Sequence, residues 1–189
     1  MNRLPEESAE RFFSGNAWSY DHIARVSTLG LDGWWKRKIL KKIPKAADRI
    51  LEQASGTGIL TCKIARLFPK SRVIGVELHE EYLKVARKKV RDLDLSNVEF
   101  IHGRAEDVIL TGGFDCIVSD YLAKYVDLDL LVAHAWRMLR KGGLLIMHEL
   151  TRPTNPQFLV LWSIHFKFLQ AYGNWKHPEW NMALNDVPF

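Results

Sequence analysis

Residues 49–58 read RILEQASGTG, and this stretch decides the fold class. Its first half, Arg49–Gln53, is apolar enough for a short buried strand, and a run of small residues follows it. Small residues let the chain turn tightly, because no bulky side chain obstructs the backbone. The apolar stripe of Ile59–Phe68 then predicts a helix, which completes a strand–turn–helix unit.

The same rhythm continues to residue 150, with four further strands and helices between them. Strands that alternate with helices and are nearly all apolar are typical of a parallel sheet covered on both faces. We therefore expect an α/β fold with a doubly wound, mainly parallel open sheet. The further strands are Ser71–Glu77, Asn97–His102, Phe114–Ser119 and Leu144–Leu150, and the helices are Glu80–Leu93 and Leu128–Arg140.

Aromatic-rich segments flank this core, and we expect a single domain over residues 1–189. Helical spacing over residues 17–43, interrupted by glycines, predicts two helices in an N-terminal cap (1–45), ahead of the core (46–155). Residues 156–189 form a helix and a tail, which we expect to cover the core or to wall an apolar substrate site. The apolar positions of this helix are Phe158, Leu161, Trp162, His165, Phe166, Leu169 and Tyr172.

Composition excludes several classes of protein. The chain has a net charge of +5, 47% hydrophobic residues and two cysteines. No apolar run reaches the roughly 18 residues of a membrane span. The N-terminus lacks the apolar stretch of a signal peptide. Cys62 and Cys116 do not have the spacing of a disulfide framework or of a metal site. We expect a cytoplasmic protein without a metal site. The basic clusters 36–42 and 87–91 predict solvated helix faces, with an acidic partner as the alternative.

Small and acidic residues stand at the predicted carboxyl ends of the strands, where open α/β sheets bind ligands. Glu77 ends the second strand, 19 positions after Gly58, and a carboxylate there can accept both hydroxyls of a ribose. A dinucleotide fingerprint read from Gly56 requires glycine at position 61, which is Thr61. No P-loop lysine follows the turn either, so both phosphate-binding interpretations are weak.

The turn and Glu77 together resemble the S-adenosylmethionine site of class I methyltransferases, through Glu52-x-Ala54-x-Gly56-Thr57-Gly58 and Gly75-Val76-Glu77. Residues 103–107 (GRAED) and 140–143 (RKGG) resemble that family's adenine-side loop and its turn into the fifth strand, with Arg104 in place of the usual Asp. The resemblance implies a Rossmann-like core and S-adenosyl-L-methionine as cofactor. The cofactor-binding residues that it implies are Tyr20, Glu52, Ala54, Ser55, Gly56, Thr57, Gly58, Glu77, Leu78, Arg104, Ala105, Glu106, Ser119 and Asp120.

That family usually adds a helix and a two-strand hairpin after strand five. Residues 173–189 (GNWKHPEWNMALNDVPF) show no strand alternation. We therefore expect the last two strands to be absent, and the exposed sheet edge to be covered by residues 157–189 or by a second subunit in a homo-oligomer.

A narrower resemblance concerns the acceptor. Residues 20–27 (YDHIARVS), with Trp34 beyond, resemble the N-terminal signature of the ubiquinone/menaquinone C-methyltransferases, and residues 137–143 (RMLRKGG) resemble their second signature. The first match departs at His22, which displaces the usual Met-Asn, and at Asp32, which replaces a His. The resemblance implies methyl transfer to a small, apolar, quinone- or lipid-like acceptor, with peripheral membrane contact. A base would remove a ring hydroxyl proton, and the candidates are His22, Asp120 and His148.

Two other functions stay open. An RNA or protein methyltransferase is favoured by the +5 charge, although Asp120-Tyr121 does not spell the Asn/Asp-Pro-Pro-aromatic turn typical of enzymes that methylate nucleic-acid bases. A non-catalytic, cofactor-binding subunit that depends on a partner is the third alternative.

Overall fold

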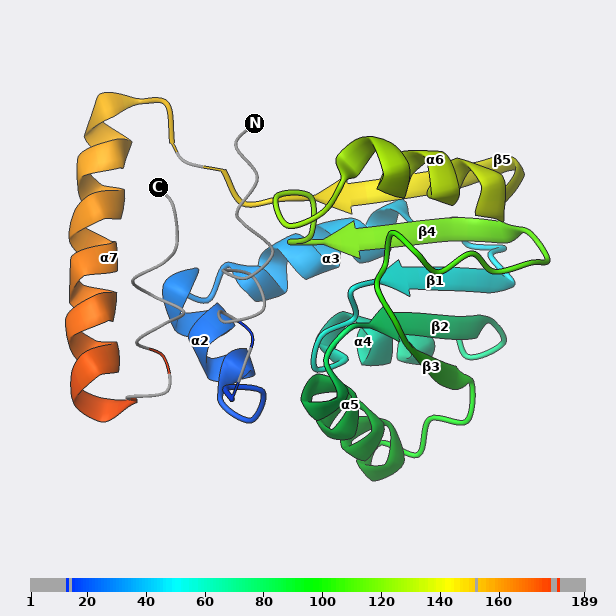
Figure 1. The fold of residues 1–189 in the computed structure, drawn as a ribbon, viewed down its shortest axis with the longest axis horizontal. Coiled ribbons are helices and arrows are strands. Elements are labelled where there is room, and N and C mark those ends of the chain that lie inside the picture. Colours follow the sequence, from blue (N-terminus) through cyan, green and yellow to red (C-terminus); the bar gives the residue numbers. More distant parts are fainter. Residues whose placement is uncertain (1–12, 14, 152, 178–179, 181–189) are drawn as a thin grey trace.

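The computed structural model describes residues 13, 15–151, 153–177 and 180 (Figure 1). A parallel five-stranded sheet lies at its centre, in the order β3-β2-β1-β4-β5, and confirms the predicted α/β fold. The strands are β1 (Arg49–Gln53), β2 (Arg72–Glu77), β3 (Val98–His102), β4 (Phe114–Asp120) and β5 (Leu139–His148). The helices are α2 (Tyr20–Ser27), α3 (Asp32–Lys42), α4 (Ile59–Leu67), α5 (Glu80–Asp92), α6 (Leu128–Met138) and α7 (Pro156–Lys176).

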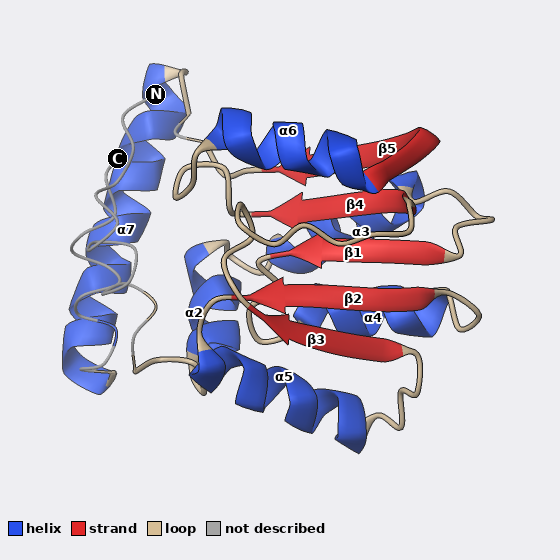
Figure 2. Cartoon of the chain, turned by 45° about the vertical axis from the view of Figure 1, so that its right-hand side comes forward, coloured by secondary structure: helices blue, strands red, loops and turns tan. Residues whose placement is uncertain are grey.

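Helices cover both faces of the sheet, with α3 and α4 on one side and α6 on the other (Figure 2). Ile50 of β1 packs against Ile39 of α3 and Ile64 of α4. The next residue of the strand, Leu51, points to the opposite face and joins the cluster that contains Met138 of α6. The three central strands, β1, β2 and β4, are buried on both faces and are not alternately exposed, while the edge strands β3 and β5 keep exposed positions.

All five strands point toward the side of the molecule that carries α2 and α7 (Figures 1 and 2). Strand β1 pairs with β2 on one side and with β4 on the other, so the order of the strands reverses there. In open sheets, the crevice at such a reversal is where ligands bind. The fold therefore places the ends of β1, β2 and β4 around one site.

Strand β5 begins earlier than predicted, because residues 140–143 form a bulge inside it. The pairing jumps from Phe114 opposite Leu139 to Cys116 opposite Leu144. Gly142 has a φ of +78°, and a Cβ on Gly143 would come 2.8 Å from the Phe114 carbonyl oxygen. The two glycines therefore serve a bulge within the strand, not a turn ahead of it.

Within the described residues no strand follows β5, and no strand pairs with its outer edge. One prediction placed residues 157–189 over that edge. Helix α7 instead lies on the side of the molecule toward which the strands point, where it packs on α2 (Figures 1 and 2). The rest of the tail, 178–179 and 181–189, lies outside the described residues. A second subunit at this edge stays a prediction.

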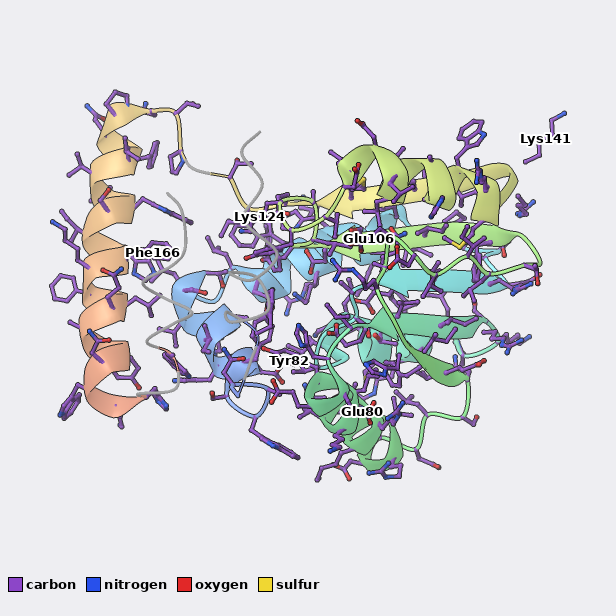
Figure 3. The ribbon with its side chains drawn as sticks, viewed as in Figure 1. Glu80, Tyr82, Glu106, Lys124, Lys141 and Phe166 are labelled. Atoms are coloured by element: carbon purple, nitrogen blue, oxygen red, sulfur yellow. The ribbon has the colours of Figure 1, made fainter. Side chains whose placement is uncertain are left out.

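Helix α7 packs on the rest of the protein through a few side chains on one face. Phe166 points inward (Figure 3) and packs with Leu169, Trp180 and Ile23 of α2. Phe158, predicted for the same face, is exposed. No helix among the described residues combines the length and the apolarity needed to cross a membrane.

Candidate active site

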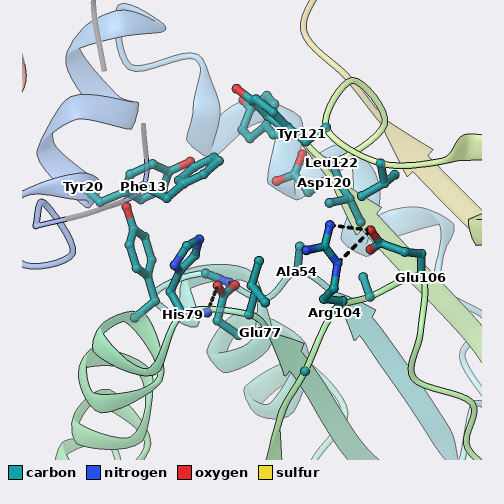
Figure 4. A pocket seen from close by; sticks show the side chains of 17 residues that line it. Phe13, Tyr20, Ala54, Glu77, His79, Arg104, Glu106, Asp120, Tyr121 and Leu122 are labelled. Atoms are coloured by element: carbon teal, nitrogen blue, oxygen red, sulfur yellow. Dashed lines mark hydrogen bonds and ion pairs between the residues drawn. The ribbon is translucent and has the colours of Figure 1, made fainter. Parts of the chain in front are cut away.

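A cavity lies at the carboxyl ends of β1, β2 and β4 (Figure 4). Its wall combines residues of the turn after β1 (residues 54–58, the first turn), the ends of β2 and β4, the loop after β3 and a side chain from α2. Nine of the predicted cofactor-binding residues line it: Tyr20, Ala54, Gly56, Glu77, Leu78, Arg104, Ala105, Glu106 and Asp120.

The first turn is a chain of left-handed residues, with φ of +55° at Ala54, +56° at Gly56 and +76° at Gly58. The Gly56 N–H donates to Glu77 Oε2 at 2.8 Å, and the Gly58 N–H donates to the Ser55 carbonyl oxygen at 2.9 Å. Both donors already have partners inside the protein, so they do not form an anion-binding nest. This geometry agrees with the absence of a phosphate-binding motif in the sequence.

Glu77 occupies the end of β2 and faces the cavity (Figure 4). Its Oε2 accepts from Gly56, and its Oε1 accepts the His79 N–H at 2.9 Å. Burial raises the pKa of Glu77, while these backbone donors act in the opposite direction. Each oxygen keeps a second lone pair, so the carboxylate can still accept hydrogen bonds from a ligand.

The loop after β3 supplies an apolar compartment. Ala105 packs with Leu122 and Val126, all of which line the cavity. The Arg104 guanidinium lies 3.3 Å from the Glu106 carboxylate (Figure 4). Because Arg104 is paired, a planar ligand in this compartment would meet apolar side chains and backbone groups rather than an isolated charge.

The other five predicted cofactor-binding residues are buried behind the cavity wall: Glu52, Ser55, Thr57, Gly58 and Ser119. Thr57 donates to Asp21 of α2 and so ties that helix to the first turn. A Cβ on Gly58 would come 3.0 Å from Ala86, so glycine permits close packing of α4 on α5.

Glu52 is a buried carboxyl that points to α4, where it accepts from Thr61. Burial raises its pKa from the usual 4.5 to about 8. A carboxyl group whose pKa is raised on folding contributes its full stability at a pH below its pKa in the unfolded state. That contribution is lost as the pH rises through its pKa in the folded state.

We therefore expect Glu52→Gln, which keeps the shape without the charge, to gain stability relative to the parent as pH rises from about 5 to 8. The difference reaches a few kcal/mol, since one pKa unit corresponds to about 1.4 kcal/mol. Urea unfolding at several pH values measures it. A stability difference independent of pH would contradict the assignment.

Asp120 and His148, two of the three candidate bases, are brought together. His148 Nδ1 lies 2.7 Å from Asp120 Oδ1, at the ends of β5 and β4. The other oxygen, Oδ2, accepts from Lys36 Nζ at 3.0 Å, and Lys36 also pairs with Asp32. The imidazole is flanked by Tyr121, with ring centroids 5.2 Å apart, and by Trp35 at 5.6 Å.

The third candidate base, His22, lies elsewhere. Its side chain is exposed on α2, 5.3 Å from the Trp180 ring and 5.7 Å from His177. Neither His22 nor His148 lines the cavity, although Asp120, the partner of His148, does. Because α2 turns His22 toward α7, the structure does not bring it to Asp120 and His148, and a catalytic role for His22 stays a prediction.

Four tyrosines line the cavity and share one electrostatic property. Burial raises the pKa values of Tyr20, Tyr82, Tyr121 and Tyr125, and neighbouring acidic groups add to the effect. All four remain phenols near neutral pH, so they donate hydrogen bonds and present aromatic faces but do not serve as bases.

Sequence reasoning missed several of these side chains. Lys36 was predicted to lie on a solvated basic face, but its side chain is only 7% exposed. The Asp32-to-Lys36 spacing of an i,i+4 pair was the available signal. Tyr82 lies five positions after Glu77, and Tyr125 lies in the loop after β4. Closeness to the carboxyl end of a strand was therefore the signal that could have indicated both as site residues. Phe13 had no local signal. Helix α7 contributes no residue to the cavity, contrary to one expectation for it.

Comparison with known proteins gives consistent matches along the chain. The sequence profile of the ubiE/COQ5 methyltransferase family matches residues 1–176. A demethylmenaquinone methyltransferase of Lactobacillus johnsonii is 30% identical over 177 residues, which cover 91% of this chain and 72% of that protein. The ubiquinone/menaquinone biosynthesis C-methyltransferase UbiE of Hahella chejuensis is 31% identical over 156 residues, with 80% and 63% covered.

Solved structures share the fold. A complex described as DhpI–SAM–HEP has a TM-score of 0.60 and 21% identity, and the match covers 83% of this chain and 70% of that one. A coclaurine N-methyltransferase bound to N-methylheliamine and SAH has a TM-score of 0.55 and 21% identity, with 60% and 35% covered.

Proposed function

Since this chain belongs to the ubiE/COQ5 methyltransferase family, we propose that it methylates a ring carbon of a small, apolar quinol, with S-adenosyl-L-methionine as the methyl donor. The two relatives described above are named for demethylmenaquinone and for ubiquinone/menaquinone biosynthesis. The observation that carries the proposal is the cavity in which the first turn and Glu77 meet at the reversal point of the sheet.

The cavity fits such a donor in its chemistry. Glu77 offers a carboxylate for a ribose diol. Leu78, Ala105 and Leu122 offer an apolar surface for adenine. The aromatic faces of Tyr20 and Tyr121 suit a cationic sulfonium, because aromatic rings attract cations.

The protein's main contribution is alignment in an enclosed site. The cofactor supplies a methyl group already activated on a sulfonium, so positioning and desolvation carry most of the rate. Tyr20, Tyr82 and Tyr125 line the cavity with aromatic rings, and we expect these rings to limit the access of water. An enclosed position also keeps a deprotonated acceptor from being solvated, which preserves its reactivity.

Proton removal is assigned to the Asp120–His148 pair. A ring carbon becomes nucleophilic when the neighbouring hydroxyl loses its proton. Asp120 accepts from Nδ1 of His148 and so leaves the lone pair on Nε2, where a proton can be received. Trp35 and Tyr121 place aromatic rings beside the imidazole, and such rings suit a planar acceptor.

An RNA or protein methyltransferase stays the alternative, because the chain carries a net charge of +5. The apolar and aromatic lining of the cavity favours the quinol instead. Binding to RNA that falls steeply with salt would support the alternative.

Calorimetric titration with S-adenosylmethionine and S-adenosylhomocysteine tests the cofactor half of the proposal. We expect one site per chain for either compound, in the micromolar range typical of enzyme substrates. Absence of heat with both compounds, from a chain shown to be folded by its circular dichroism, would contradict every methyltransferase interpretation.

We also propose that α7 contacts the membrane that holds a lipid-like acceptor. Its outer face exposes Leu161, Phe168 and Trp175, the last two at 72% and 80%. Residues 150–178 contain no Asp or Glu, while the helix carries Lys167 and Lys176. An apolar face with basic neighbours is the pattern of helices that lie in an anionic membrane surface.

We expect the chain to sediment with vesicles that contain phosphatidylglycerol, and Phe168→Ser with Trp175→Ser to weaken this binding at least tenfold, because burying one such side chain is worth about 1.5–3 kcal/mol. Trp136→Ser is the matched control, since Trp136 is 79% exposed on α6. Equal loss in the control, or formation of a dimer that α7 variants abolish, would contradict membrane contact.

A further inference from the structure

A buried lysine stands beside the proposed proton acceptor. Lys36 of α3 pairs with Asp32 on its own helix and with Oδ2 of Asp120 at 3.0 Å. On the far side of Asp120, Oδ1 lies 2.7 Å from Nδ1 of His148. Four groups from α3, β4 and β5 therefore form one line, Asp32–Lys36–Asp120–His148, which we call the charge ladder.

Lys36 remains charged near neutral pH, because its pKa is raised. Burial alone would lower its pKa, but Asp120 and Asp32 outweigh burial and hold it above the usual value. Its ammonium also lies 5.1 Å from the centre of the Tyr121 ring. A fixed positive charge on one oxygen of Asp120 weakens the attraction of that carboxylate for a proton on His148.

Within the described part of the chain, four other titratable groups lie near the ladder or interact with it. Tyr20 of α2 and Glu52 of β1 interact electrostatically with Asp120, and burial keeps both protonated near neutral pH. Tyr121 lies with its hydroxyl 3.3 Å from Asp32. Glu149, next to His148, pairs with Lys124 at 3.6 Å. Among the described residues, the charged groups paired directly with Asp120 and His148 are therefore those of the ladder.

We propose that Lys36 and Asp32 are positioning residues that set the pH at which His148 takes up its proton: Lys36 opposes protonation of the imidazole, and Asp32 limits that effect. This inference rests on the proposed function, in which His148 receives the acceptor's proton. It adds that two residues of α3, which do not line the cavity, set the pH range in which His148 can accept the proton.

The alternating signs give predictions of opposite direction. Removing the positive charge of Lys36 leaves the carboxylates unopposed, so the imidazolium is stabilised and His148 is protonated at higher pH. Removing the negative charge of Asp32 does the reverse. A role limited to packing gives no reason for opposite shifts.

Titration of the His148 ring by NMR, in the whole chain with labelled histidine, measures this without any substrate. We expect the midpoint to rise by about one pH unit in Lys36→Met and to fall by about half a unit in Asp32→Asn, as neighbouring charges shift titrations by about 1–3 units. Lys36→Arg, which keeps the charge, and Lys38→Met, on the exposed side of α3, should leave it unchanged.

If Lys36→Met does not fold, Asp32→Asn and the double variant Asp32→Asn/Lys36→Met decide the question. The double variant removes a charge pair and should return the midpoint close to that of the parent. Shifts of the same sign in both single variants, or no shift in Asp32→Asn, would overturn the ladder. These titrations do not depend on activity. If His148 is not the base, a His148 variant keeps full activity, and this result is recognised separately from any result on the ladder.

Discussion

Replacing His148 by Gln lowers kcat for methyl transfer by about 10²–10⁴-fold, the usual contribution of a positioned base. The substitution removes the nitrogen that receives the proton, while the first turn and Glu77, which bind the cofactor, stay in place. The measurement is steady-state methyl transfer with both substrates saturating, together with a calorimetric titration of the cofactor. We expect the affinity for S-adenosylmethionine to change less than threefold.

Two variants frame this result. Asp120→Asn should lose nearly as much activity, because an amide no longer fixes the Nδ1–H tautomer of the imidazole. His22→Gln is the matched control and should keep full activity, since His22 is exposed and lies beside Trp180. A His148 variant whose kcat stays within a factor of three of the parent would remove the Asp120–His148 pair from the mechanism.

Replacing Glu77 by Ala should raise the dissociation constants of S-adenosylmethionine and S-adenosylhomocysteine by about 100-fold. A hydrogen bond to a charged group contributes about 1.5–3 kcal/mol, and the carboxylate is placed to hold two ribose hydroxyls. The change also leaves the N–H groups of Gly56 and His79 without their acceptor. Calorimetric titration of both compounds measures the effect, and the similar loss for each separates ribose binding from contacts with the methyl group.

Glu80→Ala is the control for this variant. Glu80 lies three residues further along, at the start of α5, and its carboxylate pairs with Arg87 at 2.7 Å near the surface (Figure 3). Its removal should leave affinity unchanged. If Glu77→Ala also binds normally, the ribose assignment fails while the remainder of the site stands.

Local sequence signals located the strands and the cofactor side of the site. Strand β1 and the turn after it were predicted because a buried strand is apolar and a tight turn needs small residues. Glu77 was predicted as a ribose-binding group because an acidic residue at the end of the second strand lies beside the first turn in this topology. Both inferences depend on residues within about 30 positions of each other.

Long-range packing produced what the sequence did not reveal. Lys36 reaches Asp120 across 84 positions, and its one local signal, the i,i+4 spacing to Asp32, does not reveal that contact. His22 has the right residue type, but the direction in which α2 packs on Trp180 turns it away from Asp120. For α7, helical spacing located the helix, but the identity of its packing partner decided which face is exposed.

The most direct test of the central claim follows a labelled methyl group. The whole chain is incubated with S-[methyl-²H₃]adenosylmethionine and a reduced, short-chain demethylated naphthoquinol, and lipid extract, protein and added RNA are each analysed by mass spectrometry. We predict that one trideuteromethyl group appears on a ring carbon of the quinol and that the oxidised quinone is not methylated. Label in RNA or protein instead, or none in the quinol from a chain that binds the cofactor, would contradict the account.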